Sequence, residues 1–119
     1  MAKETPGIDF VLIVDDDEGV LQLIGDVVQT LGYHVLTARS GQEAIDLLRK
    51  NSQVSVLFTD VRMPDMGGEQ LAEIAMATRP DIRVVFTSGF PRPPGDAAFV
   101  PKPYRAADLI RVLPPQPLT

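Results

Sequence analysis

The stretch LIVDDDEG, from Leu12 to Gly19, carries an apolar run directly into four consecutive acidic residues. Neighbouring carboxylates repel one another, so they gather at a strand end only where a cation or a helix N-terminus receives their charge. We therefore expect positive charge at this point of the fold. Asp17 is suited to cap a helix and Glu18 to lie in its first turn. That leaves Asp15 and Asp16 for a metal ion.

The composition of the 119-residue chain is typical of one globular domain, with 45% hydrophobic and 23% charged residues. A net charge of −5 without a basic cluster argues against direct binding to nucleic acid or to an anionic membrane. The chain has no cysteine, which excludes disulfides, thiolate metal sites and cysteine nucleophiles. No apolar run approaches the roughly 20 residues of a membrane span, and the N-terminus lacks the apolar centre of a signal peptide. We predict a cytoplasmic protein.

Short apolar runs alternate with segments of helical periodicity along the chain. This alternation predicts right-handed βαβ units, and therefore a doubly wound α/β fold with a parallel sheet covered on both faces. In such sheets the ligand site lies at the carboxyl ends of the strands, near the switch in strand order. The predicted strands are Phe10–Val14, Val35–Ala38, Val54–Thr59, Val84–Thr87 and Phe99–Val100.

Four segments have the apolar spacing of amphipathic helices. The second opens on SGQE, residues 40–43, which matches a capping box, and the third ends before Pro80. The stripes expected to face the sheet are Val20, Ile24, Val27 and Leu31; Ala44, Ile45 and Leu48; Leu71, Ile74 and Ala75; and Ala106, Leu109, Ile110 and Leu113.

The segment GFPRPPGDAA, residues 89–98, interrupts this rhythm. It contains Pro91, Pro93 and Pro94, and a parallel crossover usually needs about a dozen or more residues and a helix. We expect a Pro-rich loop or a single turn in place of the fourth crossover helix. Residues 114–119 hold three prolines and are predicted to be a linker or a disordered end.

The predicted sheet brings five polar residues to one rim. Asp15 and Asp16 follow the first strand, Asp60 ends the third, Ser88 ends the fourth and Lys102 follows the fifth. Three carboxylates that face one another favour a hard divalent cation, and an all-oxygen site suits Mg²⁺ best. Once their charge is neutralised, one carboxylate can attack a phosphoryl group, while the lysine and the serine contact its oxygens.

The segments VLIVDDDEGV, VLFTDVRMPDMGG, VVFTSGF and FVPKPY resemble the four signature segments of the response regulator receiver domain of two-component signalling, in the CheY-like superfamily. The resemblance covers about Phe10 to Leu113 and rests on four motifs in this order, each at a strand end. It divides the chain into an N-terminal extension (1–9), a receiver domain (10–113) and a Pro-rich tail or linker (114–119). It also implies a flavodoxin-like, five-stranded sheet of order 2-1-3-4-5.

The resemblance implies that Asp60 accepts the phosphoryl group. Asp16 and Asp60 would bind Mg²⁺ directly, Asp15 would bind it mainly through water, and the backbone carbonyl of Arg62 would supply a further ligand. Lys102 would be the lysine that pairs with the phosphate.

Two further residues would be the switch of the domain, according to the resemblance. These are the hydroxyl of Ser88 and the ring of Phe99, which would turn inward on phosphorylation. The bond from Lys102 to Pro103 is a candidate for the cis form. Arg62 and Phe90 occupy the positions that modulate dephosphorylation in the family, and their bulk predicts slow hydrolysis.

The same resemblance implies a signalling switch rather than a turnover enzyme, one that assists its own phosphorylation and autodephosphorylation. The phosphoryl group would come from a sensor histidine kinase or a histidine phosphotransfer protein, and the signal would pass to a downstream protein that the sequence does not name.

Two other readings compete with this one. LIVDDDEGV also resembles the first motif of haloacid-dehalogenase-type phosphohydrolases, in which Asp15 would be the nucleophile and Asp17 the acid/base. Those enzymes need an acidic metal motif after the lysine, whereas the chain after Lys102 offers only Asp108, in an apolar-periodic helix. A receiver-like module that binds partners without phosphorylation is the third reading, against which the complete set of site residues argues.

Overall fold

The computed structural model describes residues 9–89, 95, 98–102 and 105–116, in which strands and helices alternate as predicted. The strands form one parallel sheet of order β2-β1-β3-β4-β5, which confirms the flavodoxin-like fold. The elements are β1 (Phe10–Val14), α1 (Glu18–Thr30), β2 (His34–Ala38), α2 (Gly41–Lys50), β3 (Val54–Asp60), α3 (Gly68–Thr78), β4 (Arg83–Ser88), β5 (Ala98–Pro101) and α4 (Ala106–Val112).

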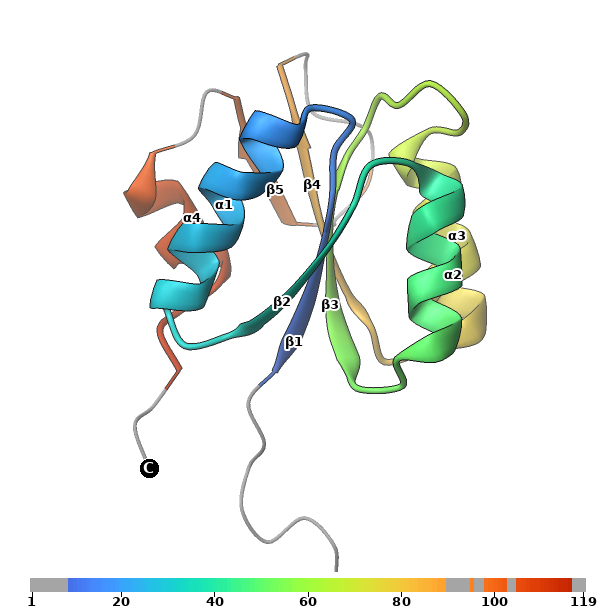
Figure 1. Cartoon of the computed structure of the whole chain (residues 1–119), viewed down its shortest axis with the longest axis horizontal. Helices are drawn as coiled ribbons and strands as arrows, with labels where there is room; N and C mark the ends of the chain where they lie inside the picture. Colours follow the sequence, from blue (N-terminus) through green and yellow to red (C-terminus); the bar gives the residue numbers. More distant parts are fainter. Residues whose placement is uncertain (1–8, 90–94, 96–97, 103–104, 117–119) are drawn as a thin grey trace, which may run out of the picture.

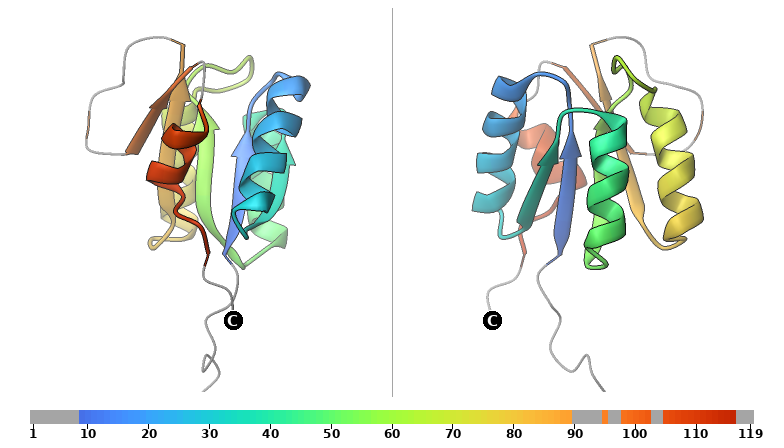
Figure 2. Two further views of the ribbon diagram at one scale, coloured as in Figure 1. Left: turned by 90° about the vertical axis from the view of Figure 1, so that its left-hand side faces the viewer. Right: turned by 45° about the vertical axis from the view of Figure 1, so that its right-hand side comes forward.

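Helices cover both faces of the sheet. α1 and α4 lie on one face, and α2 and α3 lie on the other (Figure 1). The left view of Figure 2 brings α1 and α4 in front of the sheet, and the right view brings α2 and α3 forward. From β1 the chain first adds β2 on one side and then β3 on the other side, so the switch in strand order lies between β1 and β3. A ligand crevice is therefore expected at the carboxyl ends of β1 and β3, at the upper edge of the sheet in Figure 1.

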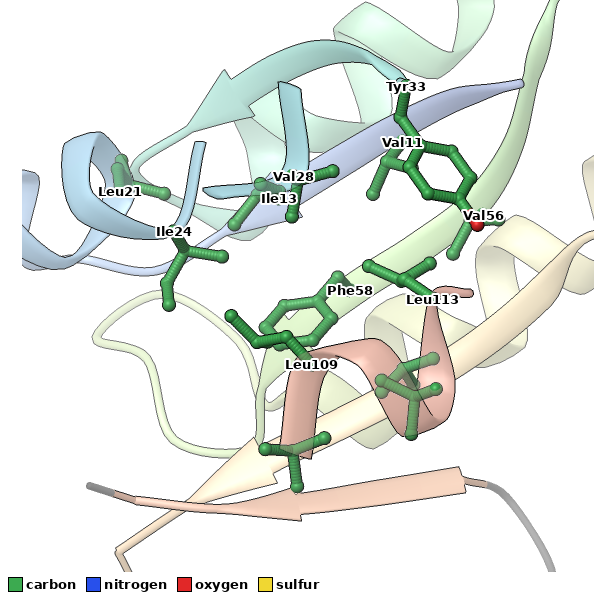
Figure 3. Packing of buried hydrophobic residues seen from close by; sticks show 13 residues of the cluster. Val11, Ile13, Leu21, Ile24, Val28, Tyr33, Val56, Phe58, Leu109 and Leu113 are labelled. Carbon is green, nitrogen blue, oxygen red and sulfur yellow. The ribbon is translucent and has the colours of Figure 1, made fainter. Parts of the chain in front are cut away.

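The core divides into two clusters because side chains alternate along β1. Val11 and Ile13 point to the face of α1 and α4, where they meet Phe58 and Leu109 (Figure 3). Leu12 and Val14 pack on the other face with residues of α2 and α3. A strand that is buried on both faces must be apolar throughout, which explains the unbroken run of β1.

Two of the predicted helix stripes are wrong in part. In α4, Ala106 is exposed and the exposed fraction of Ile110 is 43%, while Val112 is buried together with Leu109. The apolar residues of this helix are spread over more than one face, so the sequence pattern did not decide which of them would meet the sheet. The predicted stripe of α1 also differs from the buried face. Val20, Val27 and Leu31 are only partly buried at the edge of the cluster, whereas the buried residues are Leu21, Ile24, Gly25 and Val28.

The predicted helix ends are confirmed, with one difference. Asp17 caps α1, since its Oδ1 accepts the N–H groups of Gly19 and Val20 at 2.9 and 3.2 Å. Ser40 caps α2 by accepting the N–H of Glu43 at 3.1 Å. The Glu43 carboxylate, however, accepts the N–H of Arg39 at 2.8 Å, one residue before the position that a capping box predicts.

The connection between β4 and β5 spans residues 89–97, of which the structure describes only Gly89 and Gly95. The predicted replacement of the fourth crossover helix by a Pro-rich loop therefore lies largely outside the described residues, and so do Phe90 and Pro103. α4 follows β5 and is a different helix from that crossover.

The chain remains attached to the fold beyond Leu113, which is further than predicted. The Tyr33 hydroxyl donates a hydrogen bond of 2.5 Å to the carbonyl of Pro114. Gln116 donates its backbone N–H to the Leu31 carbonyl at 2.8 Å and its side-chain amide to Asp9 at 3.1 Å. Pro114 and Gln116 of the predicted tail therefore contact the fold, and its role as a linker stays a prediction. Residues 117–119 and 1–8 lie outside the described part of the chain.

Removal of the Tyr33 hydroxyl should show what this attachment contributes. Burial raises the pKa of the Tyr33 phenol, which must stay neutral to donate its proton to Pro114. A folded-state pKa above the unfolded value gives stability that is present below about pH 10 and is lost as the pH rises further. Tyr33→Phe should lower the free energy of unfolding by roughly 0.5–1.5 kcal/mol at neutral pH. Urea titrations should also show that the free energy of unfolding falls less above about pH 10 in this variant than in the wild type. Equal falls would contradict the hydrogen bond from the neutral Tyr33 hydroxyl to Pro114.

Candidate functional site

Three carboxylates meet at the carboxyl edge of the sheet. Asp15 directly follows β1 and Asp60 ends β3, and both are buried, with exposed fractions of 2% and 7%. Asp16 is exposed beside them. One carboxylate oxygen from each of the three lies within 4.8 Å of the others. The structure thus brings together the acidic residues that the sequence placed at this rim.

Lys102 supplies positive charge to this group. Its backbone N–H donates to the Ser88 carbonyl at 3.0 Å, which continues the pairing of β4 and β5 and aims the lysine at the rim. The ammonium Nζ lies 2.8 Å from Asp15 Oδ2 and 3.0 Å from Asp60 Oδ2. The positive charge expected beside the acidic run is therefore supplied in part by the Lys102 ammonium, which lies between the two buried carboxylates.

The pKa shifts follow from burial and from these contacts. Burial tends to lower the pKa of the Lys102 ammonium, but its hydrogen bonds to Asp15 and Asp60 outweigh burial and raise that pKa. Burial dominates for Asp15 and raises the pKa of its carboxyl, against hydrogen bonds from Lys102 and from the Asp17 N–H. Lys102 therefore remains charged and contacts two of the three carboxylates at this edge. The surplus of negative charge favours a further cation.

The donor set fits a hard divalent cation. Only carboxylate oxygens converge from the three aspartates, and such ions prefer oxygen ligands. The two buried carboxylates are also oriented by the backbone. Asp15 Oδ1 accepts the N–H of Asp17 at 2.9 Å, and Asp60 Oδ1 accepts the N–H of Arg62 at 3.3 Å. Arg62 thus lies at the same rim, and a role for its carbonyl stays a prediction.

Gly68 is a residue of this site that the sequence analysis missed. It begins α3, and a Cβ atom added to it would overlap the backbone carbonyl of Asp60. Its N–H donates to the Val61 carbonyl at 2.8 Å. The first turn of α3 therefore packs directly against the backbone of Asp60. The pair of glycines in MGG was a signal for such close packing, but it also suits an ordinary turn.

The two predicted switch residues lie on adjacent strands. Ser88 ends β4 and is buried, as is its neighbour Thr87. Phe99 on β5 is half-buried, pairs in register with Phe86 and packs against the cluster on the side of α2 and α3. Their roles in switching stay predictions.

The contacts of Asp17 and Asp108 argue against the phosphohydrolase reading. The Asp17 carboxylate that would serve as acid/base is engaged as the N-cap of α1. Asp108 accepts the N–H of Arg105 at 3.1 Å in the first turn of α4, where it also forms ion pairs with Arg105 and Arg111. Both acids have a structural role in a helix.

Fold and site together define a doubly wound α/β protein with three carboxylates and a lysine at the carboxyl edge of its sheet. The family model described as the response regulator receiver domain matches residues 11–113. The chain belongs to this family, whose members are the phosphoacceptor domains of two-component signalling. None of the helices in the described ranges has the length and apolar character needed to cross a membrane.

Individual relatives differ in how much of their length the chain matches. The response regulator receiver protein CpdR of Brucella abortus is 31% identical over 108 residues, which cover 84% of this chain and 89% of CpdR. The sensor kinase CckA of the same organism is 33% identical over 117 residues, which cover 91% of this chain but 12% of the kinase. Among solved structures, the chemotaxis protein CheY4 of Vibrio cholerae has a TM-score of 0.83 at 25% identity, covering 90% of this chain and 97% of CheY4.

The contact between Gly68 and Asp60 can be tested by adding one methyl group. Gly68→Ala should lower the free energy of unfolding by about 1–3 kcal/mol, because the helix start and the Asp60 backbone cannot both keep their places. Gly67→Ser is the matched control: its Cβ would lie 3.5 Å from the Val61 carbonyl, and its hydroxyl could cap α3. Urea denaturation gives the free energy of unfolding of both variants. Equal values for the two would contradict the close contact between Gly68 and the Asp60 backbone.

The charge balance can be tested by removing the ammonium. Lys102→Ala leaves Asp15 and Asp60 without their shared partner and should lower the free energy of unfolding by roughly 1–3 kcal/mol in the absence of divalent cations. Millimolar Mg²⁺ should narrow the difference from the wild type. An ion bound only to the folded state stabilises both proteins, but the variant should bind it more tightly because no ammonium competes for the Asp15 and Asp60 carboxylates. Lys50→Ala, at the exposed end of α2, is the control. Its free energy of unfolding should stay close to that of the wild type, both without and with Mg²⁺. A deficit that Mg²⁺ leaves unchanged would contradict this account of the site.

Proposed function

We propose that Asp60 accepts a phosphoryl group from a histidine kinase or a histidine phosphotransfer protein in a Mg²⁺-dependent reaction, and that the domain acts as a switch. One observation carries the proposal. The Asp60 carboxylate is buried at the end of β3, 3.0 Å from the Lys102 ammonium and within 4.8 Å of the Asp15 and Asp16 oxygens. Phosphoryl transfer needs mainly alignment and charge neutralisation, and this arrangement supplies both.

The chemical step would be an in-line displacement at phosphorus. An Asp60 oxygen forms the new P–O bond while the P–N bond of a donor phosphohistidine breaks. The imidazole, already protonated on its other ring nitrogen, leaves with the electron pair as neutral histidine. Lys102, which contacts Asp15 and Asp60, would exchange one of these carboxylate contacts for a phosphoryl oxygen. Mg²⁺ held by Asp15, Asp16, Asp60 and the carbonyl of Arg62 would neutralise charge on the transferred group.

The response to phosphorylation would begin at Ser88. The Ser88 carbonyl already accepts the N–H of Lys102, so the ends of β4 and β5 are joined next to the acceptor. A phosphoryl group that draws in the Ser88 hydroxyl would shift this strand end, and the half-buried ring of Phe99 on β5 would turn inward in response. Arg62, exposed two residues after Asp60, would slow attack by water on the acyl phosphate.

The partners are proposed from the family and from the relatives named above. The donor would be a sensor histidine kinase or a histidine phosphotransfer protein in the cytoplasm, and the recipient of the signal would be another protein. The chain spans most of the receiver protein CpdR but a small part of the kinase CckA. Both a separate receiver and a receiver joined to further domains are therefore represented among its relatives.

Intact-mass analysis and peptide mapping test the assignment of Asp60. The protein is incubated with Mg²⁺ and either acetyl phosphate or phosphoramidate, whose P–N bond resembles that of phosphohistidine, with Asp60→Ala and a chelated sample in parallel. We expect one labile phosphoryl group on Asp60 that is absent from the variant and from the sample without Mg²⁺. Label on Asp15 would support the phosphohydrolase reading instead. Failure of both donors and of a panel of histidine kinases would favour the non-phosphorylated binding module.

A further inference from the structure

We propose that Asp65 is a positioning residue for the phosphorylation site, because it ties the loop between β3 and α3 to the first turn of α2. The inference rests on the proposed function, since the loop concerned, residues 61–67, directly follows the acceptor Asp60. From the sequence, Pro64 and the glycines Gly67 and Gly68 predict that Asp65 is a turn residue rather than a metal ligand.

The carboxylate of Asp65 spans two backbone donors that are far away in sequence. Its Oδ1 accepts the N–H of Gly41 at 3.0 Å, and its Oδ2 accepts the N–H of Gln42 at 2.9 Å. These N–H groups belong to the first turn of α2, where a helix has no partners of its own for them. Both oxygens are engaged, so the side chain has one orientation although it is exposed. The bonds from Gln42 and Gly41 lower the pKa of this carboxyl, which keeps it ionised.

A second contact joins the same two segments. Met66, the next residue in the loop, packs against Gly41 so closely that a Cβ atom on Gly41 would overlap the methionine side chain. Gly41 is buried, and Met66 lies against the apolar cluster on this face of the sheet. The loop and the start of α2 therefore fit together through an apolar contact beside the polar one, at the upper edge of the molecule in Figure 1.

The ends of the loop are held by other groups. At its start the N–H of Val61 donates to the Thr87 carbonyl at 3.0 Å, and at its end the N–H of Gly68 returns to Val61 at 2.8 Å. Asp65 supplies polar contacts for the middle of the loop. Arg62, whose carbonyl is the proposed metal ligand, lies between this start and Asp65, and its N–H donates to Asp60 Oδ1 at a long 3.3 Å. Release of Asp65 should therefore let the segment around Arg62 move away from the metal site.

This role differs from simple capping because α2 has its own N-cap. The Ser40 hydroxyl accepts the N–H of Glu43 at 3.1 Å, and it belongs to the loop before α2 rather than to the loop after β3. Ser40 and Asp65 thus stabilise the same helix end from two different segments. Of these two polar caps, Asp65 is the one that comes from the loop after Asp60, and any coupling that it carries acts in both directions.

The pair of caps provides a matched experiment. Asp65→Ala and Ser40→Ala each remove an acceptor from the first turn of α2, but only the first releases the loop. Calorimetric titration with Mg²⁺ and the rate of phosphorylation by phosphoramidate are measured for both variants, under conditions where urea titrations show each to be folded. Asp65→Ala should lower Mg²⁺ affinity and rate by roughly tenfold, as the loss of an outer-shell partner does in metal sites. Ser40→Ala should leave both near the wild-type values.

Amide hydrogen exchange distinguishes a positioning role from helix capping alone. A cap alone would not make the protection of the first turn of α2 depend on Mg²⁺. In the wild type, Mg²⁺ should increase protection of the Gly41 and Gln42 N–H groups, because ordering the loop also orders its contact with α2. The increase should vanish in Asp65→Ala and persist in Ser40→Ala. If Asp65→Ala does not fold, Asp65→Asn decides the question, since it keeps the shape and one acceptor and should show a smaller loss in the same direction.

The outcomes separate this inference from the function on which it rests. Equal Mg²⁺ affinity, rate and Mg²⁺-induced protection in Asp65→Ala and Ser40→Ala would overturn the positioning role and leave the receiver function intact. A wild-type protein that neither binds Mg²⁺ nor takes up a phosphoryl group would overturn the proposed function, and this inference with it.

Discussion

The crowding of carboxylates at one edge of the sheet is the constraint on which the other features of the site depend. Asp15 and Asp60 are both buried there, and burial of two like charges is unfavourable unless a positive group lies between them. The Lys102 ammonium occupies that place, within 3.0 Å of each. Because this ammonium contacts two of the three carboxylates that converge there, negative charge stays in excess at the site, which favours a further cation. The contact that stabilises the fold without a ligand is thus the one that the proposed reaction would rearrange.

The parallel sheet explains why such a site can form at all. Each strand delivers its last residue to the same edge, whereas side chains in the middle of the strands are buried between the sheet and the helices. The four acidic residues after β1 are divided there between two uses. Asp15 and Asp16 join Asp60, whereas Asp17 caps α1 and Glu18 lies in its first turn. The positive charge expected beside this acidic run is therefore supplied twice, by a lysine and by a helix end.

The loop after β3 links the acceptor to two helices. At its end Gly68 places α3 against the Asp60 backbone, and in its middle Asp65 and Met66 hold the loop to α2. α2 and α3 also pack beside each other on one face of the sheet (Figure 2). Backbone around the acceptor is therefore fixed by packing and by hydrogen bonds from α2 and α3, which suits a site whose chemistry depends on alignment. The side of α1 and α4, by contrast, meets the acceptor strand through the apolar contacts of Phe58.

Local chemistry by itself determined the strand positions, the Asp17 cap of α1 and the end of α3 before Pro80, because each depends on residues close together in the chain. The alternation of strands and helices also predicted that Asp15, Asp60 and Lys102 would share one edge. Successive βαβ units form a parallel sheet, in which all strands end at the same edge. Only the tertiary structure decided which face of α4 is buried, that Asp65 accepts from Gly41 across 24 residues, and that Tyr33 holds Pro114 across 81. Such contacts join segments that the fold brings side by side, and an exposed aspartate in a turn has many local partners that a sequence cannot rank.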